Sequence, residues 1–348
     1  MQHKLSRIYI IDSITTAILV SRMKTKNKID VVFECNVNAQ RSGSTKNVYE
    51  LILSNKSYRL LDTIYIERPY QIYALKNPFR KMRMLRNIRD QNITKNVQLY
   101  LRGKTIITSS HSTLLWACYT QILDFEEVCE GMQEIIFPVK HNIIKTIIKK
   151  NIYSHIFPTV PRCRYVFSKH YVRSKTDIIV HENYESTNRT DDILVILNTE
   201  GKDDGHFGGR AIADKFIKHN LETIFSHASV TKKQCRYILK THPALGQLRT
   251  WLYKMEVELK KRRINFCYAD DLIDLENSVF VPTEYYIEKL GIRNILLCDV
   301  TSTVFNYDKL SVKFYGNSNE ITNLSKRNET QYALAKRFFQ LFTSMEEI

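Results

Sequence analysis

A short polar segment that follows an apolar run carries side chains suited to binding a phosphate. The run Tyr237–Leu239 predicts a strand, and Lys240-Thr241-His242-Pro243 comes directly after it. A lysine supplies positive charge, and a histidine with a pKa near neutrality can donate a proton to a departing phosphate oxygen. Pro243 stops the chain from continuing as a helix. Because ligands of parallel α/β sheets bind beyond the carboxyl ends of the strands, this position favours an anionic ligand at Lys240 and His242.

Two further polar segments lie beside predicted element ends. Glu284 comes two residues after Pro282, at the expected start of a helix, where a carboxylate can accept hydrogen bonds from both hydroxyls of a ribose. The apolar strand Leu296-Leu297-Cys298 leads into the hydroxyl cluster Thr301-Ser302-Thr303, whose hydroxyls and backbone N–H groups can bind a phosphate. Taken singly, each segment is more typical of ordinary first-turn and N-cap residues, so the weight lies on their order and spacing.

The composition indicates a globular protein that attracts anions. The chain has 348 residues, 43% of them hydrophobic, which suits two domains with sizeable cores. Lys and Arg number 52 against 36 Asp and Glu, so the net charge is +16. The 7 cysteines are scattered without a CxxC pair, which predicts reduced thiols rather than a zinc or redox site. Polar residues interrupt the first apolar run, so we expect neither a signal peptide nor a membrane span, and a cytoplasmic protein.

Short β-rich runs alternate with helical segments along the whole chain, which predicts parallel α/β sheets. The predicted strands are Arg7–Ile11, Asp30–Cys35, Thr63–Ile66, Val97–Leu101, Thr120–Asp124, Arg164–Phe167, Ile193–Leu197, Tyr237–Leu239, Ile264–Cys267 and Ile295–Cys298. The polar segment Tyr184–Asp192 predicts a linker. We therefore expect two Rossmann-like, doubly wound domains facing across a cleft, over residues 1–185 and 192–329. An amphipathic helix is expected over Gly246–Arg263, and a C-terminal helix in residues 330–348, over Thr330–Met345, packing back on the first domain.

The order Lys-x-His-Pro, Pro-x-Glu and Thr-Ser-Thr within one domain resembles the bacterial sialyltransferases of GT-B architecture, which include lipooligosaccharide sialyltransferases and capsule polysialyltransferases. That family has an acidic-acidic-Gly motif, a His-Pro motif and a Ser-Ser or Ser-Thr motif. The matching segments here are Cys129-Glu130-Gly131, His242-Pro243 and Ser302-Thr303. The resemblance covers most of the chain from Ile193 to Phe305, and less of the first domain.

The resemblance implies an inverting transfer of sialic acid from CMP-sialic acid to a hydroxyl of a cell-surface glycan, without a cofactor. It implies that His242 protonates or stabilises the departing CMP phosphate, while Ser302 and Thr303 bind that phosphate. Glu284 would hold the ribose, and Lys240 and Pro243 would complete the donor site beside the cytosine. Because CMP leaves as a monophosphate, no metal is needed to bridge two phosphates. Related transferases that use CMP-Kdo, CMP-pseudaminic acid or CDP-glycerol are the alternative.

The base that deprotonates the acceptor hydroxyl is expected at Glu130, because it should face the donor from the other domain. The family motif usually has two acidic residues before the glycine, and Cys129 takes the first place here. Burial beside like charges would raise the pKa of Glu130, and acidic residues precede it at Asp124, Glu126 and Glu127. The alternative base is in Asp203-Asp204-Gly205, which fits the motif literally but lies in the second domain.

Basic residues are concentrated in two segments, Lys76–Lys104 and Lys140–Lys150. In the second, isoleucines recur on one side of an expected helix, a pattern that suits peripheral contact with the anionic inner face of a membrane and a lipid-linked acceptor. A solvated face, or attraction of an acidic glycan, would explain the charge equally well. Binding of nucleic acid is the alternative of another class, but no known motif and no interleaved aromatic residues support it, so no nucleic acid is expected.

Overall fold

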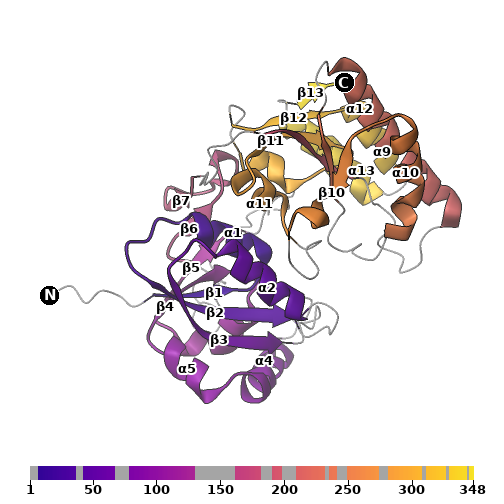
Figure 1. Ribbon diagram of the computed structural model, residues 1–348. Coiled ribbons are helices and arrows are strands. Elements are labelled where there is room, and N and C mark those ends of the chain that lie inside the picture. The colour runs from indigo at the N-terminus through magenta and orange to yellow at the C-terminus, as the bar shows by residue number, and fades with distance from the viewer. Residues whose placement is uncertain are drawn as a thin grey trace. The chain divides into compact units, whose positions relative to one another are not determined.

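The computed structural model divides the chain into two compact units, Met1–His181 and Glu182–Ile348 (Figure 1). The predicted linker Tyr184–Asp192 begins just after this division; residues 184–189 lie outside the described part of the chain, and Thr190–Asp192 belong to a strand, Thr190–Ile196, rather than to a linker. The structure describes residues 7–36, 42–66, 78–129, 161–181, 190–197, 209–231, 235–240, 249–273, 281–307, 311–326, 329–342 and 345–348.

The first unit is an α/β structure around a parallel sheet (Figure 1). Its strands are β1 (Arg7–Ile11), β2 (Ile29–Asn36), β3 (Tyr58–Ile66), β4 (Thr105–Ser109), β5 (Asp124–Val128), β6 (Arg164–Val166) and β7 (Asp177–Ile179). Its helices are α1 (Ile14–Arg22), α2 (Ser42–Ile52), α4 (Pro78–Asn92), α5 (Lys95–Leu101) and α6 (Thr113–Cys118), with the 3₁₀ helices η1 (Tyr119–Gln121) and η3 (Lys169–Tyr171). The strand order is β3-β2-β1-β4-β5-β6-β7, so the winding reverses between β1 and β4. Their carboxyl ends form the switch point of the sheet, where ligands of such folds bind.

The central strands are continuous apolar runs because parallel strands are covered on both faces. In β1, Ile8 through Ile11 are all buried, and Ile8 pairs in register with Asp30 of β2. Helices α4, α5 and α6 cover one face, where Leu85, Val97 and Leu114 join the same core cluster as Ile8. This packing fixes the edge of the sheet at which the strands end.

The structure corrects two of the predicted strands. Val97–Leu101 belongs to α5, because the hydroxyl of Thr94 accepts a hydrogen bond from Val97 N at 3.2 Å and caps the helix, and the strand comes later, at β4. Thr120–Asp124 lies mostly in η1 and the turn before β5. Two consecutive glutamates, Glu126 and Glu127, are not typical of a buried strand, so the sequence does not predict β5 there. The structure accommodates them because each forms an ion pair with an arginine.

The second unit is also an α/β structure around a parallel sheet. Its strands are β8 (Thr190–Ile196), β9 (Tyr237–Lys240), β10 (Phe266–Tyr268), β11 (Ile292–Leu297), β12 (Lys313–Gly316) and β13 (Met345–Glu347). Its helices are α9 (Gly209–Val230), α10 (Arg249–Lys261), α11 (Thr283–Glu288), α12 (Ser318–Ser325) and α13 (Glu329–Leu341), with the 3₁₀ helices η5 (Ala269–Leu272) and η7 (Ser302–Phe305). The strand order β10-β9-β8-β11-β12-β13 is that of a Rossmann-like, doubly wound sheet, with its switch point between β8 and β11.

Helices α9 and α10 cover one face of this sheet. Leu221 of α9 and Leu252 of α10 join a cluster with Val195 and Leu239 from the central strands. The predicted amphipathic helix is α10, which begins at Arg249 rather than Gly246. Among the helices that the structure describes, none combines the length and the apolar character needed to cross a membrane.

The C-terminal helix is shorter than predicted and belongs to the second unit. It ends at Leu341, and Met345–Glu347 pair in parallel with β12 as the edge strand β13. Phe338 packs edge-on against Phe305, with 5.5 Å between the ring centroids. Phe342 meets Phe314 of β12 in the same way, also at 5.5 Å. These rings attach α13 to the face of the sheet opposite α9, because Phe314 alternates with Tyr315 of the α9 side.

Candidate functional site

Glu284 is a buried carboxylate that is held on one side only. It lies in the first turn of α11 with 6% of its surface exposed. Its Oε1 accepts hydrogen bonds from Thr303 Oγ1 at 3.1 Å and from Asn306 Nδ2 at 2.8 Å. These bonds and the positive end of the helix dipole offset part of the cost of burying the charge. Among the described residues, no hydrogen bond reaches Oε2, so that oxygen can accept one from a ligand.

The 3₁₀ helix η7 and its C-cap residue Asn306 supply the two groups that hold Glu284. Thr301 is its N-cap, and its hydroxyl accepts a bond from Thr303 N at 3.4 Å. Tyr307 donates to Glu288 Oε1 at 2.7 Å, which ties α11 to the segment after η7. The loop after β11 and the helix α11 therefore form one hydrogen-bonded piece around the Glu284 carboxylate. The hydroxyl of Thr303 is used within this piece, and the side chain of Ser302 lies outside the described residues.

Lys240 is a buried cation at the carboxyl end of β9. Only 6% of its surface is exposed, and its Nζ lies 5.7 Å from the centroid of the Tyr286 ring. In the part of the chain that the structure describes, this ammonium forms no hydrogen bond and no ion pair. Burial lowers the pKa of Lys240 to about 8, while the carboxylates of Asp270 and Glu284 act in the opposite direction. A desolvated ammonium near a half-satisfied carboxylate is an arrangement that a polar ligand would complete.

Asp270 is a site residue that the sequence reasoning missed. It lies in η5, directly after β10, and Tyr286 of α11 donates to the carbonyl oxygen of Ala269 at 3.2 Å. This bond joins η5 to α11 beside Lys240. Burial raises the pKa of Tyr286, and the nearby Asp270 charge raises it further. The rule that found Lys240, an ionisable residue just after a strand, would also have found Asp270 after the predicted strand Ile264–Cys267.

The structure brings three of the predicted site residues into one neighbourhood of the second unit, namely Lys240, Glu284 and Thr303. It adds Asn306 and Asp270 to them. The other predicted residues lie outside the described part of the chain; they are Glu130, His242, Pro243, Asp203 and Asp204. Their assignments stay predictions.

Two of the acidic residues that precede Glu130 in the sequence, Glu126 and Glu127, are paired with arginines of the first unit. Glu126 is buried, accepts from Arg7 at 3.1 Å, and accepts from the Tyr165 hydroxyl at 2.7 Å. Glu127 accepts from Arg164 Nε at 3.0 Å.

A second polar cluster lies at the switch point of the first unit. Asp12, directly after β1, accepts hydrogen bonds from Thr16 at 2.6 Å and from Ser109 at the end of β4. Glu34 of β2 is fully buried and accepts from the hydroxyl of Ser112 at 2.7 Å, and also from two backbone N–H groups of α6. These bonds fix the starts of α1 and α6 against the strand ends. The bonds of Ser109 to Asp12 and of Ser112 to Glu34 join residues 97 and 78 positions apart, so no local sequence pattern predicts them.

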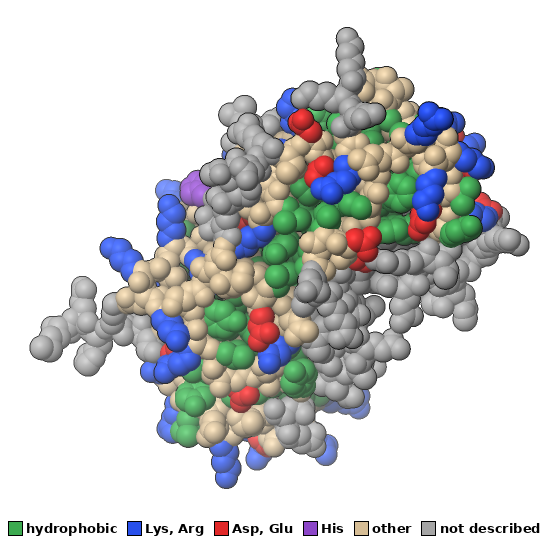
Figure 2. Space-filling model, in the orientation of Figure 1, with side chains coloured by type: hydrophobic (Ala, Val, Ile, Leu, Met, Phe, Trp, Pro, Cys, Tyr) green, Lys and Arg blue, Asp and Glu red, His purple; other side chains and the backbone are tan. Residues whose placement is uncertain are grey.

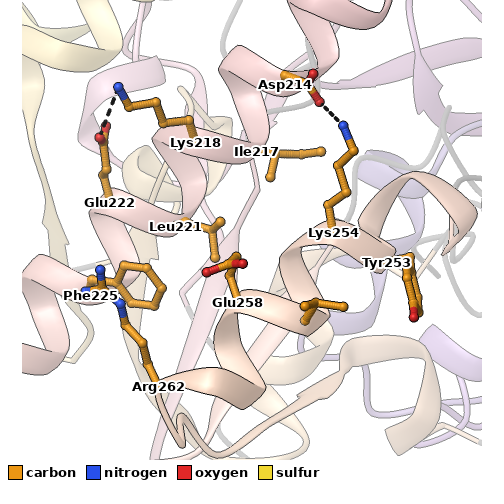
Figure 3. Close-up of a pocket in the computed structure, with 11 residues that line it drawn as sticks. Asp214, Ile217, Lys218, Leu221, Glu222, Phe225, Tyr253, Lys254, Glu258 and Arg262 are labelled. Carbon is orange, nitrogen blue, oxygen red and sulfur yellow. Dashed lines mark hydrogen bonds and ion pairs between the residues drawn. The ribbon is translucent and has the colours of Figure 1, made fainter.

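A hollow of about 480 Å³ lies on the outer surface between α9 and α10 (Figure 3). Its charged side chains point toward one another, as Lys218 does toward Glu222 and Lys254 toward Asp214. Arg262 stacks on the ring of Phe225 at 3.9 Å. The site residues Lys240 and Glu284 do not line it. We assign no function to this hollow, since its lysines and carboxylates are already paired on the helices that form it and Arg262 is stacked on Phe225.

Comparison with known proteins gives little. No protein-family model matches the chain, and no curated protein matches it in sequence. Among solved structures, the chain is similar to a glycosyltransferase from Rickettsia africae ESF-5. The two share 8% sequence identity and a TM-score of 0.40, over 98% of this chain and 89% of that chain. A likeness at this level decides neither the fold nor the function.

Proposed function

We propose that this protein is a glycosyltransferase whose second unit binds the nucleotide of an activated sugar. One observation carries the proposal: Glu284 has one carboxylate oxygen fixed by Thr303 and Asn306, while among the described residues neither its other oxygen nor the nearby buried ammonium of Lys240 has a hydrogen-bond partner. Lys240 ends β9, and Glu284 is bonded to residues that follow β11, so both groups are tied to the carboxyl ends of strands in a doubly wound sheet, where nucleotides bind in such folds.

The ligand that best completes this arrangement is a ribonucleotide. A ribose offers two adjacent hydroxyl donors to Glu284 Oε2, and the Lys240 ammonium donates to a carbonyl or phosphate oxygen. Asp270 then favours cytosine, because an aspartate accepts from the exocyclic amine of that base. Two opposite charges that are buried without touching are costly in the free protein, and a ligand that bonds to both recovers part of that cost.

The finer proposal is transfer from CMP-sialic acid to a glycan hydroxyl, and it rests on the motif resemblance. The bond between the anomeric carbon and the phosphate oxygen breaks, and CMP leaves with that electron pair. A new bond forms from the acceptor oxygen to the opposite face of the same carbon, which inverts it, while the acceptor proton passes to a carboxylate. His242, two residues beyond Lys240, stabilises the departing phosphate together with Ser302. Thr303 is a positioning residue in this scheme, because its hydroxyl holds Glu284.

A donor panel tests the proposal. The protein is incubated with CMP-sialic acid, CMP-Kdo, CMP-pseudaminic acid and CDP-glycerol in separate reactions, with lipooligosaccharide and sialylated glycans as acceptors and with EDTA in parallel. We expect release of CMP from CMP-sialic acid that depends on an acceptor and continues in EDTA. Release of CMP or CDP only from another donor would mean that the transferred group is not sialic acid. Loss of all transfer in EDTA would show that the reaction needs a metal ion.

A matched pair of variants ties the activity to the site. Glu284→Gln removes the carboxylate, whereas Glu222→Gln makes the same change on the exposed surface of α9. Only the first should raise the Kd for CMP and the KM for the donor. If neither variant affects them, the nucleotide does not bind at Glu284.

A further inference from the structure

Helix α4 of the first unit has exposed apolar side chains in addition to those that it packs into the core of the unit. Leu85 and Ile88 are buried in the core cluster, whereas Phe79 is 78% exposed and Met82 is 41% exposed. At about 100° per residue, Phe79 lies opposite Ile88, and Met82 lies between Phe79 and the buried Leu85.

The same exposed side is basic. Arg83 and Arg86 lie within about 100° of arc with Phe79 and Met82 in helical projection. Over its 15 residues, α4 carries basic residues at Arg80, Lys81, Arg83, Arg86 and Arg89. Its single acidic residue, Asp90, lies on the same side and pairs with Arg86 at 3.7 Å and with Arg89 at 3.2 Å. Figure 2 shows Lys and Arg side chains at the lower end of the first unit, where Figure 1 places α4 and α5.

We propose that this side of α4, defined by Phe79, Met82, Arg83 and Arg86, binds the surface of an anionic lipid bilayer. A helix lying in the plane of a membrane inserts apolar side chains below the headgroups and presents arginines to the lipid phosphates. Charge complementarity selects this partner, since both α4 and the whole chain, at +16, are strongly basic. A nucleic acid would use the arginines but would give an exposed methionine no apolar phase to enter. The inference is independent of the proposed function, because it uses no residue of the second unit.

Sedimentation with vesicles tests the proposal. Vesicles of phosphatidylcholine, with or without phosphatidylglycerol, are mixed with the protein and centrifuged at low and high salt. We expect binding only to the anionic vesicles, and less of it at high salt. Each basic residue near such a surface contributes a factor of about five in affinity, so Arg83→Gln with Arg86→Gln should weaken binding at least about tenfold. Phe79→Ala with Met82→Ala should weaken it as well, while leaving its salt dependence unchanged.

Matched changes in the second unit serve as controls. Lys260→Gln with Lys261→Gln removes the same charge from the exposed end of α10, and Tyr253→Ala removes an exposed aromatic ring from the same helix. Both control variants should bind the anionic vesicles with an affinity within about twofold of the unchanged protein, because neither removes a residue of the proposed contact. Equal losses in the control variants would overturn the proposal in favour of diffuse attraction. So would full retention in Phe79→Ala with Met82→Ala together with displacement by single-stranded RNA, which would indicate a nucleic-acid surface.

Discussion

Replacing Lys240 by methionine should make the free protein more stable. The lysine is almost fully buried at the end of β9, and its ammonium has no ion pair or hydrogen bond among the described residues. Methionine has a similar length and no charge, so it can keep the contact with Tyr286 and remove the buried ammonium. A buried lysine that stabilised the fold would give the opposite result.

The expected gain in the free energy of unfolding follows from the pKa of Lys240, which burial lowers from 10.5 to about 8. One pKa unit corresponds to about 1.4 kcal/mol, so the lowered pKa means that the charged lysine destabilises the folded protein by about 3 kcal/mol below pH 8. Between pH 8 and 10.5, the unfolded chain binds more protons at this residue than the folded chain does, so the stability of the unchanged protein rises with pH. The variant should therefore be the more stable by up to about 3 kcal/mol at pH 7, and the gap should close by about pH 10.5.

Urea denaturation measures this effect in the second unit. In a Trp116→Phe background, Trp251 is the remaining tryptophan, so its fluorescence reports that unit. Lys218→Met, on the exposed surface of α9, is the matched control and should leave the unfolding midpoint unchanged. The same Lys240 variant should bind CMP more weakly. A variant that is less stable at pH 7, or a gap that does not narrow between pH 8 and 10.5, would refute the reasoning.

Three further predictions concern single groups. Thr303→Val should raise the Kd for CMP about fivefold to tenfold in calorimetry, because Glu284 loses a hydrogen bond worth about 1 kcal/mol or more; an unchanged Kd would remove its positioning role. Glu34→Gln should destabilise the first unit by about 2–4 kcal/mol, since its amide turns a donor toward buried donors, and should leave CMP affinity unchanged. His242→Ala and Glu130→Ala should each abolish transfer, with CMP binding kept in the second; full activity of Glu130→Ala would move the base to Asp203 or Asp204.

Strands with continuous apolar runs could be predicted from the sequence. The strand Arg7–Ile11 has the predicted bounds, and Tyr237–Lys240 extends the prediction by one residue. A continuous apolar run is enough to predict such strands, because helices cover both faces of a parallel sheet. Val97–Leu101 is apolar in the same way and is a helix, because a hydroxyl at Thr94 caps it. Edge strands such as Met345–Glu347 have too few residues and too little apolar surface to be recognised.

The candidate site was predictable only in part. Lys240, Glu284 and Thr303 follow strands or begin helices, which is the rule that found them. This rule does not identify Asn306, because its contact with Glu284 joins residues 22 positions apart in the sequence and depends on the packing of η7 against α11. The burial that lowers the pKa of Lys240 is likewise a property of the packed unit, and no local pattern records it.

Calorimetric titration with CMP and with 2′-deoxy-CMP tests most directly the central claim that Glu284 binds the ribose of a nucleotide. The two ligands differ only in the 2′-hydroxyl, from which Glu284 Oε2 would accept a hydrogen bond. We predict that CMP binds the unchanged protein about tenfold more tightly than 2′-deoxy-CMP, and that Glu284→Gln removes this preference. Absence of CMP binding, or equal affinity for the two nucleotides in the unchanged protein, would contradict the account.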